Sequence, residues 1–297
     1  MEKRKRRFRD RKDGYYLGKE VPALTRFMTY LLPQRTDNEA VMNEEIDITA
    51  LNEFIAKKNA ELEEGGFKYT IFHVVIAAIL KTIYHRPKLN YFIQGRRYYE
   101  RKHISFSFII KKKFDDRSEE ALAILKMGEE GKAPLDEVRE KVKKAVEDVR
   151  VHNKTDGTTG IIEKLVKLPR FMLRFVCSVL HFLDFHGWTP ASLMKEDPYY
   201  STVFISNLGS IKMHADYHHL TNYGTNSFFV IVGEKHKAPV FKEDGTFELK
   251  EFLPIGMTID ERIADGLYFA NSLKLMRKYL ADPELLLQPI EVEEAMQ

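Results

Sequence analysis

The chain has 297 residues, of which 44% are hydrophobic and 31% are charged, and its formal net charge is +3. This composition belongs to a globular protein with a substantial core and excludes an intrinsically disordered chain. Because the net charge is small, no whole-molecule attraction to nucleic acid follows, and we expect no nucleic-acid partner.

Compartment and membrane signals are weak. Cys177 is the only cysteine, so no intrachain disulfide can form, which favours a reducing compartment. The positive charges at the N-terminus are not followed by the apolar stretch of a secretory signal. No uncharged run approaches the roughly 20 apolar residues that a membrane-spanning helix needs. We therefore expect a cytoplasmic protein.

The first third of the chain alternates predicted helices and strands. Residues 1–18 form a basic arm; such a run can bind nucleic acid or anionic lipid, but a solvated tail or an intersubunit arm is the favoured interpretation. The helix expected from Thr70 to before Pro87 is apolar on nearly every side and should be buried. The other expected elements are helices at 21–32 and about 50–64, and strands at 40–47, 89–99 and 104–114.

The middle of the chain is helical. A polar helix is expected at about 134–151, before a break at 157–160. Residues 161–185 are the most apolar region, yet four cations interrupt them, so we expect a helix that restarts or kinks at Pro169 and cannot span a bilayer. A basic, apolar helix of this kind can lie on a membrane surface. Packing against protein, as a core, interface or lid helix, is the favoured interpretation.

The last third is rich in strands. A strand at 201–205 ends in Ser206 and Asn207, and an irregular stretch at 211–225 holds His214, His218 and His219. Further strands are expected at 227–233, 239–242 and 246–259, with an Asp-Gly hairpin turn, and a helix at 265–280. Interspersed helices and strands indicate the α/β or α+β class.

The stretch Thr258 to Gly266 (TIDERIADG), which runs into that last helix, resembles the D-H-R-x-x-D-G segment of the chloramphenicol acetyltransferase-like acyltransferases. This family includes the catalytic domain of the 2-oxo acid dehydrogenase dihydrolipoyl acyltransferases. Further blocks keep the family's order at 42–51, 69–78, 86–90, 204–209 and 281–287. The resemblance implies a two-layer α/β sandwich with a mixed sheet, assembled as a trimer. We expect one domain at 19–287, with a helical insertion at about 160–200 and an acidic tail at 288–297.

The resemblance also implies roles for single residues. In the family a His at a subunit boundary takes a proton from a thiol or hydroxyl, and the nucleophile attacks a thioester carbonyl. Ser206 matches the donor to the oxyanion, in a turn that includes Asn207. Asp265 matches a structural Asp that pairs with an Arg, for which Arg262, Arg26 and Arg35 are the candidates. Gly266 is expected to permit tight packing.

Glu261 stands where the family has its catalytic His. A carboxyl group has a reference pKa of about 4.3, against about 6.5 for imidazole, and is the poorer base near neutral pH. Burial raises the pKa of a carboxyl group, whereas a paired Arg lowers it. Three hypotheses stay open: Glu261 is the base, His218 or His219 replaces it (His73 being a weaker candidate), or the site is inactive and the protein binds or scaffolds, in solution or at a membrane.

The expected co-substrate is acyl-CoA. The 297 residues hold no lipoyl or subunit-binding domain of the kind that dihydrolipoyl acyltransferases carry, so we expect a soluble thioester and a small acceptor of unknown identity. No permanently bound cofactor is expected. Lys111, Lys112 and Lys113 can meet CoA phosphates, although a solvated strand end is the simpler interpretation. No metal set is expected from one cysteine and scattered histidines.

Overall fold

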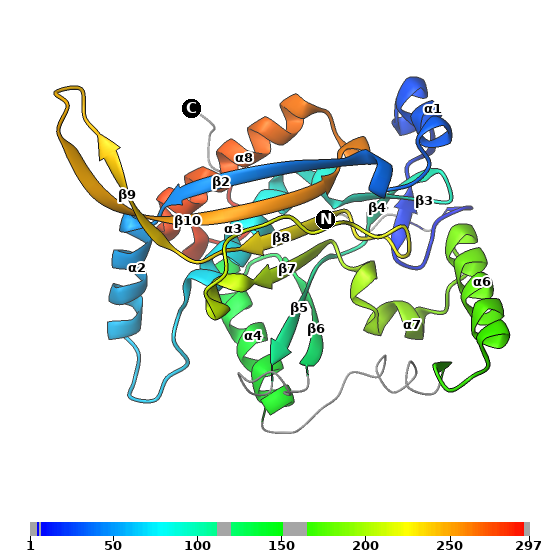
Figure 1. The fold of residues 1–297 in the computed structure, drawn as a ribbon, viewed down its shortest axis with the longest axis horizontal. Coiled ribbons are helices and arrows are strands. Elements are labelled where there is room, and N and C mark those ends of the chain that lie inside the picture. The colour runs from blue at the N-terminus through cyan, green and yellow to red at the C-terminus, as the bar shows by residue number, and fades with distance from the viewer. Residues whose placement is uncertain (1–4, 6, 112–119, 151–164, 294–297) are drawn as a thin grey trace.

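A mixed sheet of seven strands forms one layer of the molecule (Figure 1). The computed structural model describes residues 5, 7–111, 120–150 and 165–293. The strand order is β2-β10-β8-β7-β5-β6, with β9 paired to the first half of β10. Neighbours β5, β7 and β8 run parallel and the other pairs are antiparallel. The strands are β2 Glu39–Asp47, β5 Ile104–Lys111, β6 Glu120–Met127, β7 Val203–Asn207, β8 Phe228–Val232, β9 His236–Phe241 and β10 Phe247–Asp260.

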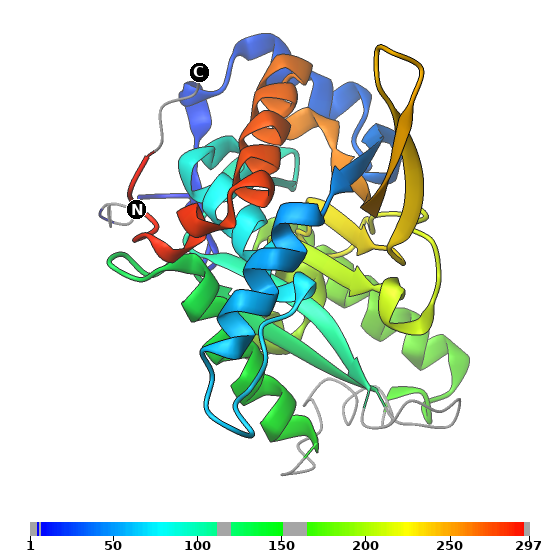
Figure 2. The ribbon, with the colours of Figure 1, turned by 90° about the vertical axis from the view of Figure 1, so that its left-hand side faces the viewer.

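Four helices form the second layer, on one face of this sheet (Figure 2). They are α2 Thr49–Ala60, α3 Ile71–His85, α4 Pro134–Arg150 and α8 Gly266–Ala281. Helix α3 packs against the other three, and all its residues from His73 to Ile83 are buried, as its apolar sequence predicted. Thr70 caps its first turn through a capping box with His73. The predicted two-layer mixed α/β architecture is therefore confirmed.

The opposite face of the sheet carries a smaller apolar cluster. Phe204, Phe229 and Ile231 of strands β7 and β8 form it together with Leu220. Leu220 belongs to the irregular stretch after β7, which crosses this face. Because side chains alternate along a strand, Ser206 shares the face of Phe204 rather than that of the helices.

A second, three-stranded antiparallel sheet contains β1 Gly14–Tyr16, β4 Arg97–Arg101 and β3 Tyr91–Gln94. The prediction of a single strand at 89–99 is wrong, because the chain reverses at Gly95 and Arg96. Both residues have positive φ, 56° and 59°, which is the signature of a tight type I′ hairpin turn. Strand β1 also places part of the basic arm in a sheet, where the sequence indicated no structure.

The remaining elements mostly follow the predictions. Helix α1 Ala23–Leu31 and the three helices α2, α3 and α8 lie where they were expected. Strand β6 was not predicted. Helix α6 Arg170–His186 begins directly after Pro169, as expected, and a short α7 Ala191–Glu196 follows. The predicted break at 157–160 and the start of the apolar region at 161–164 lie outside the described residues.

The two ends of the molecule differ in the elements that they expose. The β9–β10 hairpin extends from one end, and α1 and α6 lie at the other (Figure 1). The protruding hairpin and the two surface helices therefore lie at opposite ends of the long axis of the molecule.

Candidate active site

The turn after β10 is anchored by Asp260, which is fully buried. Its carboxylate accepts two hydrogen bonds from the Arg262 guanidinium, from Nε at 2.8 Å and from Nη2 at 2.7 Å. The Nε atom of Arg35 lies 3.6 Å from the same carboxylate. Arg262 also donates to the carbonyl oxygens of Leu32 and Pro33, at 2.9 and 3.2 Å. This network fixes the backbone on both sides of Glu261.

Glu261 itself is exposed at the start of a 3₁₀ turn, Glu261–Ile263. Within the described part of the chain, the structure gives its carboxylate no hydrogen bond or ion pair. Glu261 is thus held on a rigid backbone, with its side chain exposed to solvent.

Asp265 does not pair with an arginine. Its exposed carboxylate accepts a hydrogen bond from the Tyr268 backbone N–H at 2.9 Å and so caps helix α8. This backbone hydrogen bond lowers the pKa of Asp265 below its usual value. The expected pairing with Arg262, Arg26 or Arg35 is wrong, because Arg262 and Arg35 bind Asp260 and Arg26 is exposed on α1.

Gly266 is not needed for close packing. A Cβ atom at this position would meet nothing within 4 Å, so the expectation of tight packing is also wrong. Gly266 is the first residue of α8 and faces solvent.

Ser206 and Asn207 end strand β7 at a cavity of about 840 Å³. The Asn207 side chain closes the following turn by accepting a hydrogen bond from the Ser210 N–H at 3.3 Å. Ser206 is half-buried, and no side-chain hydrogen bond is recorded for it among the described residues. Its hydroxyl is therefore available to a ligand in the cavity.

The same cavity is lined by Lys111 at the end of β5, as well as by Lys212 and Lys235. The sequence singled out Lys111 but not the other two, which come from separate loops and converge only in the fold. Lys112 and Lys113 lie outside the described residues. The lining of the cavity thus combines Ser206 with several cations, of which Lys235 also pairs with Glu251 at 3.1 Å.

His73 also lines this cavity but is poorly suited to be a base. Burial, together with the nearby Arg139, lowers the pKa of His73 to about 4. Its Nδ1 accepts a hydrogen bond from the Thr70 backbone N–H at 3.1 Å, so in the neutral ring the proton sits on Nε2. The imidazole is engaged in capping α3.

His218 and His219 form an exposed stack on the second face of the sheet. The His218 ring lies 4.1 Å from the Phe229 ring and 4.5 Å from that of His219. Nδ1 of His218 is 2.8 Å from the His219 carbonyl oxygen, which can only accept. The ring therefore carries its proton on Nδ1 and, when neutral, leaves Nε2 as a free acceptor.

The strand register separates the predicted site residues. Ser206 is paired with Ile231, and Ile231 is paired with Gly256 of β10. Glu261 follows Gly256 by five residues, which span roughly 16 Å at about 3.3 Å per residue. Phe229, under His218, pairs with Phe204, two residues before Ser206. Within one chain Ser206 is therefore nearer to His218 than to Glu261.

Metal ligation finds no support here. Across residues 5, 7–111, 120–150 and 165–293, no group of three or more His, Cys, Asp or Glu side chains is arranged to hold a metal ion. In the His214–His219 segment, the His218 ring stacks on the rings of His219 and Phe229.

Comparisons with known proteins relate the sequence and the fold to one family. Residues 190–288 match the model of the catalytic domain of the 2-oxoacid dehydrogenases acyltransferase family. This range contains Ser206, Glu261 and Asp265. A sequence comparison with curated proteins gave no match.

Solved structures extend the likeness to most of the chain. The cubic core of a pyruvate dehydrogenase multienzyme complex is 16% identical, over 92% of this chain and 91% of that chain, with a TM-score of 0.58. Dihydrolipoamide acetyltransferase of Azotobacter vinelandii is 19% identical, over 90% and 93%, with a TM-score of 0.57. A chloramphenicol acetyltransferase is 13% identical, over 93% and 100%, with a TM-score of 0.52.

The chain has the chloramphenicol acetyltransferase-like fold.

The resemblance inferred from sequence is thereby confirmed, and the matched family is one of acyltransferases. Among the described residues, every helix falls short of the length or the apolar character that a membrane span requires.

Proposed function

We propose that the chain transfers an acyl group from acyl-CoA to a small acceptor, at a site shared by two subunits of a homotrimer. The observation that carries this proposal is the location of Ser206 and Glu261 at opposite ends of one sheet. The two residues cannot meet within a chain, but a symmetric assembly can bring one end of the sheet to the other end of its neighbour's.

A likeness in spacing supports these positions. The structural study of the Azotobacter enzyme concerns the role of a serine, a histidine and an asparagine in its catalytic mechanism, and the asparagine follows the histidine by four residues. Here Asp265 follows Glu261 by the same four residues, and Ser206 lies upstream.

The Ser206 cavity suits the thioester. Its volume of about 840 Å³ can hold a sizeable organic group, since ligand pockets commonly measure about 300–1,000 Å³. Lys111, Lys212 and Lys235 on its wall would attract the phosphates of CoA. The half-buried Ser206 hydroxyl would lie beside the thioester carbonyl.

The proposed reaction needs one base and one oxyanion donor. The Glu261 carboxylate takes the proton from the acceptor's hydroxyl, amine or thiol, and the acceptor atom attacks the thioester carbonyl carbon. The carbonyl electron pair moves onto oxygen, where the Ser206 hydroxyl of the neighbouring subunit donates a hydrogen bond, worth about 3 kcal/mol in comparable sites. Collapse of this intermediate breaks the carbon–sulfur bond, and the CoA thiolate takes the proton back from Glu261.

Covering by a neighbouring subunit helps a glutamate to act as this base. Removal of water raises the pKa of a carboxyl group, which brings its proton affinity closer to that needed near neutral pH. The buried Asp260–Arg262 pair keeps the Glu261 backbone in place while the side chain reaches across the boundary.

His218 is the competing base. Its free Nε2 and its place near Ser206 on one sheet face favour it. The two assignments predict different effects of substituting Glu261 and His218 on turnover, so a single activity assay separates them.

The test is release of free CoA thiol from acetyl-CoA and longer acyl-CoAs with a panel of small hydroxyl, amine and thiol acceptors. We expect Glu261→Gln to reduce turnover by roughly 10²–10⁴-fold, the usual contribution of a general base. The double variant His218→Ala/His219→Ala should keep most activity. Glu53→Gln, an exposed glutamate on α2, is the matched control and should behave as wild type.

The reverse pattern, with a silent Glu261→Gln and an inactive double histidine variant, would assign the base to His218. Full activity in both variants would refute both assignments.

A non-catalytic binding protein is the second candidate. It is favoured by a glutamate at the position where the sequence resemblance expects a histidine, in a turn that the buried Asp260 contacts anchor. This alternative predicts no thiol release with any acceptor, while Glu261→His should create measurable release.

A further inference from the structure

Helix α6 exposes one aromatic flank. Phe171, Phe175, Val179 and Phe182 follow one another at spacings of four, four and three residues, which places them on one side of the helix. Phe171 is 73% exposed and Phe175 is 70% exposed. The opposite side packs on the protein and includes the buried Asp184. Such a stripe marks an interaction surface rather than ordinary scattered exposure.

Cations lie beside this stripe. Arg170 and Arg174 are exposed on the neighbouring flank of α6, and the exposed Lys167 precedes the helix. The one acidic residue of α6 is Asp184, which is buried and accepts a hydrogen bond from the Tyr200 hydroxyl at 2.6 Å. The exposed surface of α6 is therefore aromatic and basic, without a carboxylate.

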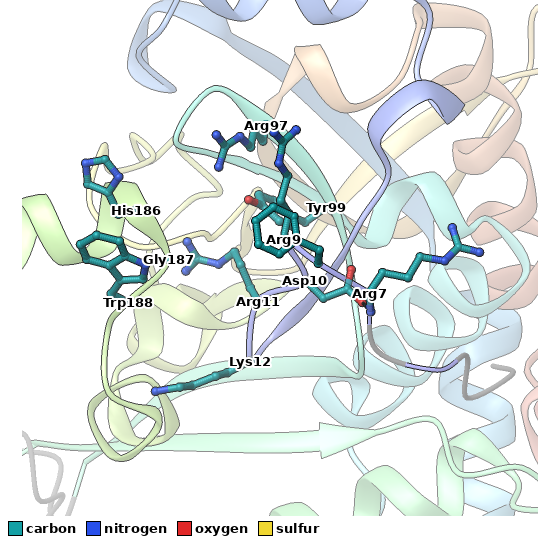
Figure 3. A pocket seen from close by; sticks show the side chains of 11 residues that line it. Arg7, Arg9, Asp10, Arg11, Lys12, Arg97, Tyr99, His186, Gly187 and Trp188 are labelled. Carbon is teal, nitrogen blue, oxygen red and sulfur yellow. Dashed lines mark hydrogen bonds between the residues drawn. The ribbon is translucent and has the colours of Figure 1, made fainter.

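Stacked rings connect the stripe to a cavity. The Phe182 and His186 rings lie 4.5 Å apart, and the His186 and Trp188 rings lie 5.0 Å apart. His186 and Trp188 then form one side of a cavity of about 1,010 Å³ (Figure 3). The surface of α6 and this cavity are thus continuous.

The cavity is strongly basic, and we call it the basic pocket. Gly187 lies between His186 and Trp188, and the other lining residues come from the N-terminal arm and from β4, namely Arg7, Phe8, Arg9, Asp10, Arg11, Lys12, Arg97 and Tyr99 (Figure 3). Arg11 is buried and bound by Asp13, at 2.9 Å, and the Asp10 carboxylate accepts from backbone N–H groups. Arg7 is within 3.8 Å of Glu20.

Three cations of the basic pocket have no carboxylate partner among the described residues. In the part of the chain that the structure describes, Arg9, Lys12 and Arg97 form no ion pair with a carboxylate. Lys12 Nζ does donate to the Thr189 carbonyl oxygen at 3.4 Å, and the Arg9 guanidinium lies over the Phe8 ring. Phe8, beside them, is 90% exposed. Cations and exposed aromatic rings therefore occur together in the basic pocket just as they do on α6.

We propose that the aromatic stripe of α6 and the basic pocket together dock the chain on an anionic lipid surface. The aromatic side chains would enter the boundary between headgroups and acyl chains, where Phe and Trp partition favourably. Arg9, Lys12 and Arg97 would bind lipid phosphates, and Arg170 and Arg174 would add to the attraction.

A second copy of the chain fits this face less well. A two-fold contact through the same face would bring the cations of both copies together. The described surface of α6 offers no carboxylate to neutralise them. An anionic bilayer supplies both the negative charge and the apolar layer that the face lacks.

The test uses Trp188, which is the only tryptophan of the chain. We expect the protein to co-sediment at low salt with vesicles of phosphatidylcholine containing phosphatidylserine, but not with phosphatidylcholine alone. Trp188 emission should shift to the blue on binding, and high salt should release the protein because it screens the charges.

Two triple variants locate the surface. Phe171→Ser/Phe175→Ser/Phe182→Ser should abolish the blue shift. Arg9→Gln/Lys12→Gln/Arg97→Gln should weaken binding by roughly a hundredfold, since each cation near an anionic surface contributes roughly fivefold. The control is Phe241→Ser/Phe247→Ser on the β9–β10 hairpin, equally exposed at the far end of the molecule (Figure 1); it should bind as wild type.

Several results would overturn the proposal. These are no co-sedimentation with anionic vesicles, unchanged binding by either triple variant, or loss of the native oligomer in the phenylalanine variant, which would make the stripe a subunit contact. If single-stranded RNA that carries the same total charge as the vesicle surface releases the protein from the vesicles, the face would instead be assigned to nucleic-acid binding.

Discussion

Asp260, and not Asp265, is the buried aspartate of the motif around Arg262. The sequence places an aspartate on either side of Arg262, and it cannot tell which of the two is buried. The pairing of β10 with β2 and β8 answers the question, because it carries Asp260 into the interior and leaves Asp265 on the surface. The motif was recognisable from sequence, whereas the roles of its two carboxylates depended on the sheet.

Replacement of Asp260 by Asn should be strongly destabilising. It leaves the buried Arg262 and Arg35 guanidinium groups without their carboxylate, and breaking a buried ion pair in this way costs about 3–5 kcal/mol. Urea denaturation of purified protein measures the loss in the free energy of unfolding.

The matched control is Asp265→Asn. Asn caps a helix about as well as Asp, so this variant should change the stability by well under about 1 kcal/mol. Equal effects of the two substitutions would show that Asp260 does not anchor the turn.

His73 predicts a pH dependence of stability. Burial lowers the pKa of His73 to about 4, whereas the unfolded value is about 6.5. As the pH falls, His73 of the unfolded chain therefore takes up a proton before His73 of the folded chain does. The stability that the neutral, buried His73 contributes is complete above about pH 6.5 and is lost as the pH falls to about 4.

The size of this effect is roughly 3 kcal/mol. It can be isolated by comparing urea unfolding of wild type and His73→Gln at pH 7 and at pH 4.5. The difference in stability between the two proteins should shrink at the lower pH. A difference that stays constant would mean that His73 does not titrate below its unfolded pKa.

At the scale of elements, the periodicity of apolar residues predicted most helices. Helices α1, α3, α4 and α8 have amphipathic or apolar patterns, whereas α2 was predicted from its capping residues and the Gly65-Gly66 pair that follows it, and each lies near its expected range. Strand β6 was missed because its residues, EALAILKM, are mostly helix formers. Antiparallel pairing with β5 overrides that preference. The β3–β4 turn was missed because Gly95-Arg96 is not a usual hairpin dipeptide.

Gly95 lies in the β3–β4 turn, at the point where this turn contacts the end of α6. A Cβ atom at this position would overlap the backbone oxygen of Phe185 in α6. Gly95→Ala should therefore destabilise the protein and loosen α6, which limited proteolysis followed by mass spectrometry can detect.

Gly245→Ala in the β9–β10 turn is the control for backbone strain. Its φ is also positive, 82°, but a Cβ there meets nothing within 4 Å. This control variant should lose only roughly 1–2 kcal/mol of its free energy of unfolding, the cost of a left-handed backbone conformation for a residue with a Cβ atom. It should show no new cleavage in α6. If Gly95→Ala costs no more than the control, the contact with α6 is unimportant.

At the scale of the whole molecule, the residues of the candidate site could be proposed from the sequence, but their arrangement could not. Ser206, Glu261 and Lys111 were all identified from the sequence. Their distribution over the two ends of the sheet follows from strand register, which depends on pairings between distant segments. The basic pocket was likewise not predictable, because it joins the N-terminal arm to the end of α6.

The most direct test of a shared active site is complementation between two inactive variants. Ser206→Ala and Glu261→Gln chains, each inactive alone, are unfolded, mixed in equal amounts and refolded, and thiol release from acyl-CoA is measured. If Ser206 of one subunit works with Glu261 of the next, mixed trimers should recover about a quarter of the wild-type rate, since half of the serines meet half of the glutamates. No recovery, although the mixed trimers form, would contradict a site built from two chains.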